Sequence, residues 1–252
     1  MNYRIYSLSE NSLVVQLPPE ISESQIRFLF QLKSAINKLN WRAIVEVMVT
    51  FHELSILFDI TAIDIDELKE EVVRMIEDQS GELSEDAVDC REIFIPVCYE
   101  EEMALDKDRL VRKTGLSFSD IVELHQNSSY LVYMMGFLPG FMYLGGLNQK
   151  LFCPRLEVPR PKIEVGSIGI ADDQTGIYPM ESPGGWNILG RTPLTLFQYH
   201  QSRGTRNGAT PSPDAHFVRP LDIIKFTPIT RQQYDELQNV SIGEFQLIHS
   251  KA

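Results

Sequence analysis

Two arginines, Arg155 and Arg160, each follow a proline and lie five residues apart. Proline fixes its own φ, so the backbone that presents each guanidinium has little freedom left to lose on ligand binding. The planar fork of donors suits a carboxylate or a phosphate. Alternatively, each arginine forms an ion pair with one of the many acidic residues, Glu157 and Glu164 among them. Residue type alone favours the ion pair.

The segment Ser182-Pro183-Gly184-Gly185-Trp186 has a second pattern that suits anion binding. Two glycines allow a positive φ or a close approach of the backbone, so the N–H groups of Gly184 and Gly185 can face an oxyanion while Trp186 forms a wall. The alternative is a tight β-corner with Trp186 in the core, and both can hold together. Arg191 follows five residues later, near the far end of the same expected strand.

Three further side chains have the right chemistry for a polar site. His125 ends an expected helix, where the dipole favours its protonated form and a general acid/base role; a lone histidine is nevertheless more often a capping or core residue. Gln174 and Tyr178 flank Gly176 and are candidates for hydrogen bonds to a ligand. The pair Asp172-Asp173 beside them reads first as a solvated turn, or else as a group that positions a cation or an amine.

These candidates lie in a Gly- and Pro-rich stretch, residues 130–191, in which strand-like runs alternate with corners. Gly and Pro at this density oppose helices, and the Val, Ile, Tyr and Phe between them favour strands. We therefore expect β-structure whose corners gather distant side chains on one surface. The side chains expected to meet there are Arg155, Arg160, Gln174, Tyr178, Trp186 and Arg191.

The elements around this stretch predict a second domain over residues 90–240. A strand at 91–99, helices at 106–114 and 117–125, a strand at 221–228 and a short helix at 231–237 surround the β-rich core. Many short strands with Gly/Pro corners and two helices favour a closed or nearly closed β-barrel. The polar segment 202–214 is expected to be the least ordered part by composition.

The first 85 residues predict a small α+β domain. Alternating residues at 3–8 and 12–17 indicate a hairpin, and Ser22 to Gln25 fit a capping box before a helix whose apolar stripe runs from 26 to 39. Strands at 43–51 and 53–58 and a second helix around 68–76 follow. The order ββαββα is typical of helices on one face of an antiparallel sheet. The acidic segment 82–89 is the expected linker.

Composition excludes several function classes. The chain has 252 residues, 43% of them hydrophobic, and a net charge of −12, which argues against a nucleic-acid binder. Its three cysteines lack a CxxC spacing, so free thiols are expected and neither a zinc site nor a disulfide framework. There is no P-loop, GxSxG elbow, HExxH or dinucleotide fingerprint. No run is apolar enough for a membrane helix and no signal peptide is evident, so we expect a cytoplasmic protein that binds neither membrane nor metal.

Several Gly/Pro-rich strings resemble one family closely: Gly136–Phe141, Pro154-Arg155, Pro159-Arg160, Gln174–Pro179, Ser182–Trp186 and Gly190–Pro193. By these strings the chain resembles the family of the 5-oxoprolinase B subunit, also called KipI or allophanate hydrolase subunit 1. The resemblance is dense over 91–197 and weak in the first 85 residues. It implies a small ferredoxin-like α/β sandwich followed by a cyclophilin-like β-barrel.

The resemblance also implies a function. The family's activity is the ATP-dependent opening of 5-oxo-L-proline to L-glutamate by subunits A, B and C, with ATP as co-substrate. Because this chain has no P-loop, its ATP handling is expected to be atypical or to lie largely on a partner subunit. Alternatives within the family are inhibition of a histidine kinase and hydrolysis of allophanate or another urea-derived amide. For the enzyme, His125, Arg155 and Arg160 are the expected catalytic residues. The expected substrate-binding residues are Gln174, Tyr178, Gly184, Gly185, Trp186 and Arg191.

Three positions depart from the family's pattern. Asp172-Asp173 stand where a small Gly-rich pair is expected, Leu221 stands in place of a turn glycine, and the segment 202–214 is longer than usual. Because the first departure lies near the expected pocket, it bears on the identity of the substrate.

Overall fold

The computed structural model describes residues 2–79, 90–197, 199–200, 210–211 and 217–249. The chain divides into two compact units, 1–89 and 90–252. The acidic segment 82–89 lies outside the described residues, and so does the polar segment 202–214 apart from 210–211. No helix in the described ranges has both the length and the apolar character that crossing a membrane requires.

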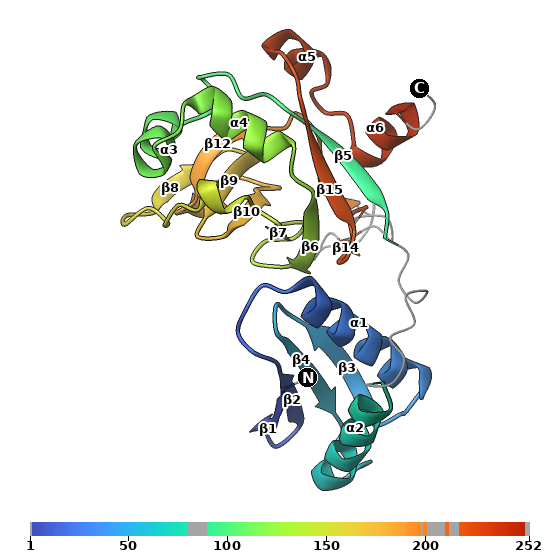
Figure 1. Ribbon diagram of the computed structural model, residues 1–252. Helices are drawn as coiled ribbons and strands as arrows, with labels where there is room; N and C mark the ends of the chain where they lie inside the picture. Colours follow the sequence, from blue (N-terminus) through green and yellow to red (C-terminus); the bar gives the residue numbers. More distant parts are fainter. Residues whose placement is uncertain (1, 80–89, 198, 201–209, 212–216, 250–252) are drawn as a thin grey trace. The chain divides into compact units, whose positions relative to one another are not determined.

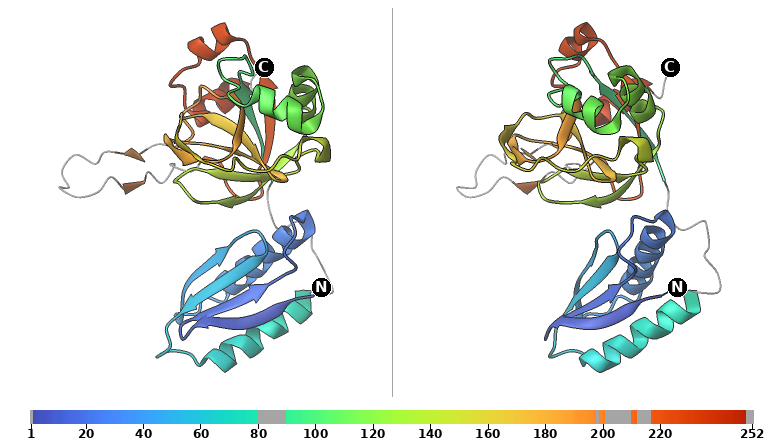
Figure 2. Two further views of the ribbon diagram at one scale, coloured as in Figure 1. Left: turned by 90° about the vertical axis from the view of Figure 1, so that its left-hand side faces the viewer. Right: turned by 60° about the vertical axis from the view of Figure 1, so that its left-hand side comes forward.

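The first unit is a four-stranded antiparallel sheet covered on one face by two helices (Figures 1 and 2). Its elements are β1 (Arg4–Ser9), β2 (Ser12–Gln16), α1 (Glu23–Lys38), β3 (Ile44–Val49), β4 (Glu53–Phe58) and α2 (Ile65–Gln79). The strand order is β1-β2-β4-β3. One core joins Leu29 and Leu32 of α1 and Val72 of α2 to Val15 and Ile56 of the sheet, so the α+β prediction is confirmed.

One predicted detail of this unit is wrong. Ser22 is the N-cap of α1, but its side chain accepts no capping hydrogen bond. The Gln25 side chain instead donates to the Glu20 carboxylate at 2.7 Å. The apolar stripe that packs on the sheet therefore fixes this helix without the capping box, as tertiary packing commonly does.

The second unit is a seven-stranded, nearly closed barrel with helices around it (Figure 1). Its strands are β5 (Glu92–Val97), β6 (Tyr130–Met135), β7 (Met142–Gly145), β9 (Ser167–Ala171), β10 (Gln174–Ile177), β12 (Asn187–Arg191) and β15 (Ile223–Pro228). The smaller pairs are β8 (Arg160–Ile163) with β11 (Ser182–Gly184), and β13 (Tyr199–His200) with β14 (Thr210–Pro211). The helical elements are α3 (Lys107–Thr114), α4 (Phe118–Gln126), the 3-10 turn η2 (Gln149–Leu151), α5 (Arg231–Glu236) and α6 (Ile242–His249).

The barrel is closed by a short contact between its two end strands. The sheet order is β12-β9-β10-β7-β6-β15-β5, and β5 with β15 is its parallel pair. Cys98, just after β5, exchanges backbone hydrogen bonds of 2.8 and 3.0 Å with Arg191 at the end of β12. The nearly closed barrel is thus confirmed. Helix α6 was not predicted, and its Ile242 and Phe245 complete the core.

Two of the three departures from the family's pattern fall on left-handed backbone positions. Asp172 has φ +54° and Leu221 has φ +72°. Glycine adopts this region without a steric penalty, whereas a Cβ is disfavoured there. The backbone conformation therefore explains why glycine suits these positions.

Candidate functional site

A pocket of about 280 Å³ lies in the second unit where three Gly/Pro-rich segments meet. Its walls carry five aromatic rings and one arginine, and its lining is Phe137, Phe141, Tyr143, Arg155, Pro159, Tyr178, Pro183, Gly184, Gly185 and Trp186. Two larger hollows, of about 410 and 510 Å³, are lined by other residues. We single out the smaller pocket because it combines clustered aromatic rings with a cation.

Phe141 lies at the centre of the aromatic wall. Its ring centroid is 4.8 Å from that of Tyr143 and 5.1 Å from that of Tyr178. Phe137 and Trp186 meet it edge to face at 5.7 and 5.6 Å. Such pairs contribute about 0.5–1.5 kcal/mol each beyond buried area. The rings therefore hold one another in place and offer a preformed apolar surface to a ligand.

Arg155 supplies the positive charge of the pocket. Its guanidinium carbon lies 5.7 Å from the ring centre of Trp186, within the range of a cation–π interaction. Its Nε is 3.5 Å from a carboxylate oxygen of Asp172, and both side chains are more than half exposed, at 58 and 60%. An ion pair this long and this exposed contributes little stability. A ligand carboxylate can therefore displace Asp172 at low cost.

Tyr178 forms a buried side of the pocket, with 1% of its surface exposed. Burial raises the pKa of its phenol to about 12, although a hydrogen bond with the backbone of Trp186 opposes the rise. The group is therefore neutral at physiological pH. Its ring lines the pocket, and its hydroxyl keeps its proton.

The two glycines at the pocket, Gly184 and Gly185, differ in how much space surrounds a side chain at their positions. A Cβ on Gly184 would collide with the Tyr178 hydroxyl and lie 2.6 Å from Cδ1 of Ile163. A Cβ on Gly185 would have its nearest neighbour at 3.7 Å, an ordinary contact. The Gly185 carbonyl accepts the N–H of Leu156 at 2.7 Å. Gly184 is thus required by packing, and Gly185 ties the pocket corner to the loop that carries Arg155.

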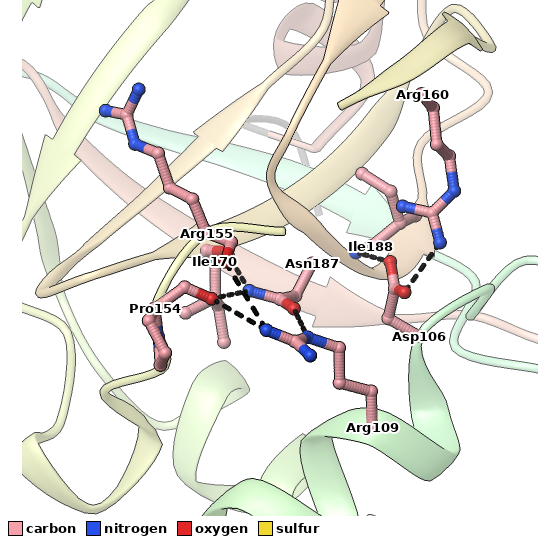
Figure 3. Close-up of polar contacts among 8 residues, drawn as sticks. All are labelled: Asp106, Arg109, Pro154, Arg155, Arg160, Ile170, Asn187 and Ile188. Atoms are coloured by element: carbon pink, nitrogen blue, oxygen red, sulfur yellow. Dashed lines mark hydrogen bonds and ion pairs between the residues drawn. The ribbon is translucent and has the colours of Figure 1, made fainter. Parts of the chain in front are cut away.

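Arg160 does not share the pocket with Arg155. It donates to the Asp106 carboxylate at 2.6 Å, and Asp106, which is 5% exposed, also accepts the backbone N–H of Ile188 at 2.6 Å (Figure 3). The Asp106 side chain therefore joins β8 to β12. The interpretation that Arg160 is an ion-pair residue fits this geometry, with Asp106 as the partner and not Glu157 or Glu164.

Arg191 and Gln174 also lie away from the pocket. Arg191 ends β12, pairs with Ser167 of β9 and closes the barrel through its backbone. Gln174 begins β10 opposite Ala171. The expectation of three guanidinium groups around one cleft is therefore not met, because Arg160 is held by Asp106 and neither Arg160 nor Arg191 lines the pocket.

His125 lies in the barrel core with no exposed surface. Its Nδ1 is 2.8 Å from the Tyr99 hydroxyl and its Nε2 is 3.1 Å from Thr175 Oγ1. Since Thr175 donates its own proton to the Gly169 carbonyl, the ring is fixed as the Nε2–H tautomer. Burial lowers the pKa of His125 to about 3. The expectation of a helix-end cation is wrong because desolvation outweighs the dipole, and this sealed position does not suit a general acid/base.

Several residues that build the site were not predicted from the sequence. Phe137, Phe141 and Tyr143 belong to a string that stands out by its glycines and prolines, not by its rings. A count of aromatic residues beside Pro/Gly corners was the available signal. Asp106 and Arg109 lie in the helix predicted over 106–114, where no local pattern links them to the site.

Metal binding finds no support in the described residues, which contain no group of three or more His, Cys, Asp or Glu side chains able to hold an ion. Cys98 and Cys153 are buried free thiols and Cys90 is partly buried, as predicted. Burial raises the pKa of the Cys98 and Cys153 thiols, so both stay protonated and unreactive.

A barrel preceded by a small α+β unit, with an aromatic pocket at its Gly/Pro corners, defines the class of this protein. The family described as the carboxyltransferase domain, subdomain C and D, matches residues 3–205. Within this class, the B subunit of 5-oxoprolinase from Bacillus subtilis (strain 168) is 32% identical over 241 residues, covering 93% of this chain and 96% of the relative. The chain belongs to the 5-oxoprolinase B subunit family of carboxyltransferase C and D subdomain proteins.

Two further comparisons extend this result. The B subunit of 5-oxoprolinase from Haemophilus influenzae is 36% identical over 201 residues, covering 80% of this chain and 91% of the relative. The crystal structure of TTHA0988 superimposes with a TM-score of 0.69 at 27% identity and covers 86% of this chain. The present chain spans 39% of that longer protein.

Proposed function

We propose that this protein is the B subunit of an ATP-dependent 5-oxoprolinase, which hydrolyses 5-oxo-L-proline to L-glutamate together with subunits A and C. The relatives that bear this name match the chain over most of its length and theirs. The geometric observation that carries the proposal is Arg155 beside Trp186 in an aromatic pocket. An ATP-dependent reaction of this kind also fits a protein of the cytoplasm.

The pocket suits the chemistry of 5-oxoproline. This substrate is a small five-membered lactam ring that carries one carboxylate. Arg155 offers the carboxylate a charged, planar donor fork. The aromatic wall around Phe141 offers the ring an apolar surface. Arg155 in our proposal therefore binds the substrate, and His125, Arg160, Arg191 and Gln174 do not.

ATP is needed because a lactam carbonyl is unreactive toward water. Transfer of the γ-phosphoryl group to the lactam oxygen releases ADP. One water then adds to the ring carbon, and cleavage of the C–N bond leaves an acyl phosphate, which a second water converts to glutamate and phosphate. Phosphoryl transfer requires several cations around the phosphates, whereas this pocket presents one arginine. We therefore assign ATP binding mainly to a partner subunit.

Reconstitution of the complex tests this function. Purified A, B and C proteins are mixed with ATP and 5-oxoproline, and glutamate and ADP are measured. We expect glutamate only with all three subunits, and a loss of roughly tenfold or more in kcat/KM for Arg155→Met, because a charged hydrogen-bond pair is removed. No glutamate from an intact complex would reject the proposal.

A second candidate function rests on the same aromatic wall. A proline ring in a protein segment, such as one from a histidine kinase, also packs well on aromatic faces. An autophosphorylation assay at saturating protein separates the two functions. Inhibition of the kinase without any glutamate from the reconstituted complex would favour the second candidate.

We also propose that the two units are independent domains with finer fold types. The element order of the first unit, ββαββα, equals the ferredoxin-like βαββαβ order with its last strand moved to the front. The second unit would be of the cyclophilin-like barrel type. Expression of residues 1–85 and 90–252 separately tests independence: each should unfold in one cooperative transition.

A further inference from the structure

The backbone at Arg155 accepts hydrogen bonds from two side chains that belong to other elements. Asn187 of β12 donates to the Pro154 carbonyl at 3.0 Å and to the Ile170 carbonyl at 3.0 Å. Arg109 of α3 donates to the Pro154 and Arg155 carbonyls at 3.4 Å each (Figure 3). The carbonyls on both sides of the Arg155 Cα are thus occupied.

Arg109 and Asn187 also fix each other. Arg109 Nε donates to Asn187 Oδ1 at 2.7 Å, and Asn187 has no exposed surface. The oxygen of the Asn187 amide therefore accepts a hydrogen bond from Arg109 of α3, and its nitrogen donates to two backbone carbonyls. A buried amide satisfied on both sides has one stable orientation, so the pair acts as a single rigid support.

The same segment is tied on its other sides by backbone hydrogen bonds. Cys153 and Asp172 exchange two bonds, of 3.2 and 2.7 Å, and Leu156 donates to the Gly185 carbonyl at 2.7 Å. The side chain of Arg155 contrasts with this fixed backbone. It is 58% exposed, and Figure 3 shows its guanidinium pointing away from Arg109 and Asn187.

We propose that Arg109 and Asn187 are positioning residues that set the place of Arg155 over Trp186 and thereby the affinity of the pocket for a carboxylate. The inference rests on the proposed function for the identity of that carboxylate. Its physical basis is preorganisation: a cation on a fixed backbone loses less freedom when it binds. Neither residue is among those that line the pocket, so both act through Arg155.

The test replaces Arg109 with Met and uses Arg112→Met as the matched control. Arg112 lies on the same helix and is exposed, so both variants lose one charge from α3. The first readout is kinetic, in the reconstituted complex. We expect Arg109→Met to raise the KM for 5-oxoproline roughly fivefold while kcat changes by less than about twofold, since orientation at the carboxylate is lost and the reacting carbonyl is untouched.

The second readout does not require activity. The chain has two tryptophans, Trp41 in the first unit and Trp186 in the pocket, so 5-fluorotryptophan labelling gives two fluorine resonances. Loss of the guanidinium in Arg155→Met should shift the Trp186 resonance. Arg109→Met should shift it in the same direction, with the Trp41 resonance unmoved as an internal control.

The outcomes separate this inference from the proposed function. A Trp186 resonance and a KM in Arg109→Met that equal those of Arg112→Met would overturn the positioning role. If the wild-type complex makes no glutamate, the proposed function fails, and the fluorine shift alone then decides the role of Arg109. Should Arg109→Met not fold, Arg109→Lys keeps the charge but cannot reach all three oxygens, and an unchanged shift in that variant would also overturn the inference.

Discussion

The two Pro-Arg segments of the second unit look alike in sequence and differ in structure. Arg155 lies on a loop whose backbone is fixed while its side chain reaches the pocket. Arg160 begins β8 and is held in an ion pair by the buried Asp106. A preceding proline restricts the backbone in the same way at both arginines. The neighbouring elements decide whether the guanidinium is already held by a buried carboxylate.

The largest effect on stability is expected when Arg160→Met is compared with Arg155→Met. Arg160→Met leaves the Asp106 charge buried without its partner and should lower the free energy of unfolding by about 3–5 kcal/mol. Arg155→Met removes an exposed ion pair and should cost less than about 1 kcal/mol. Urea unfolding of both variants measures the difference. Equal losses would mean that the two arginines are not distinct in role.

The second test concerns His125, which is fully buried in the barrel core. Its pKa is about 3 in the folded protein, against an ordinary value of 6.5, so the unfolded state binds the proton first as pH falls. The contribution of His125 to the free energy of unfolding is complete above pH 6.5 and is lost as the pH falls from 6.5 to 3, by on the order of 1 kcal/mol per pH unit.

Urea unfolding between about pH 7.5 and 4.5, a range that spans the start of this loss, measures the slope. His125→Gln cannot titrate and should show a flatter dependence on pH over the same range. A slope unchanged in His125→Gln would place the acid sensitivity in other groups.

The third test compares the two glycines at the pocket corner. Gly184→Ala forces a methyl group against Tyr178 and Ile163 and should cost about 1–3 kcal/mol, as overpacking does. Gly185→Ala makes only ordinary van der Waals contacts, the nearest at 3.7 Å, and should change stability by less than about 0.5 kcal/mol. Thermal unfolding of both variants is the measurement. A larger loss in Gly185→Ala would show that the corner is packed differently.

The smallest effect is expected at Asp172, which pairs with Arg155 and which we propose to compete with the ligand carboxylate. Asp172→Asn keeps a residue type that tolerates the left-handed backbone and removes the competing charge. Affinity for 5-oxoproline should rise by roughly two- to fivefold, the scale of an exposed ion pair. Asp173→Asn, with the same charge change, is the control. Equal affinities of the two variants in a calorimetric titration would show that the Asp172 carboxylate does not compete with the ligand for Arg155.

Much of the fold could be predicted because its signals are local. The hairpin of β1 and β2 and the apolar stripe of α1 both depend on residues a few positions apart. The gathering of Tyr178, Trp186 and the glycine pair with Arg155 was also predicted, since Pro and Gly corners must bring strand ends together. Helix α6 was not predicted because Ile242 and Phe245, the buried residues in its described part, are too few to form a recognisable apolar stripe.

The sequence by itself determined the chemical content of this protein: an acidic chain without a phosphate loop, with two Pro-Arg strings and rings beside Gly/Pro corners. Only the tertiary structure decided which arginine lines the pocket. Asp106 lies 54 residues before Arg160, and Arg109 lies 46 residues before Arg155. Burial of an ion pair depends on what packs around it, and no spacing along the chain encodes that.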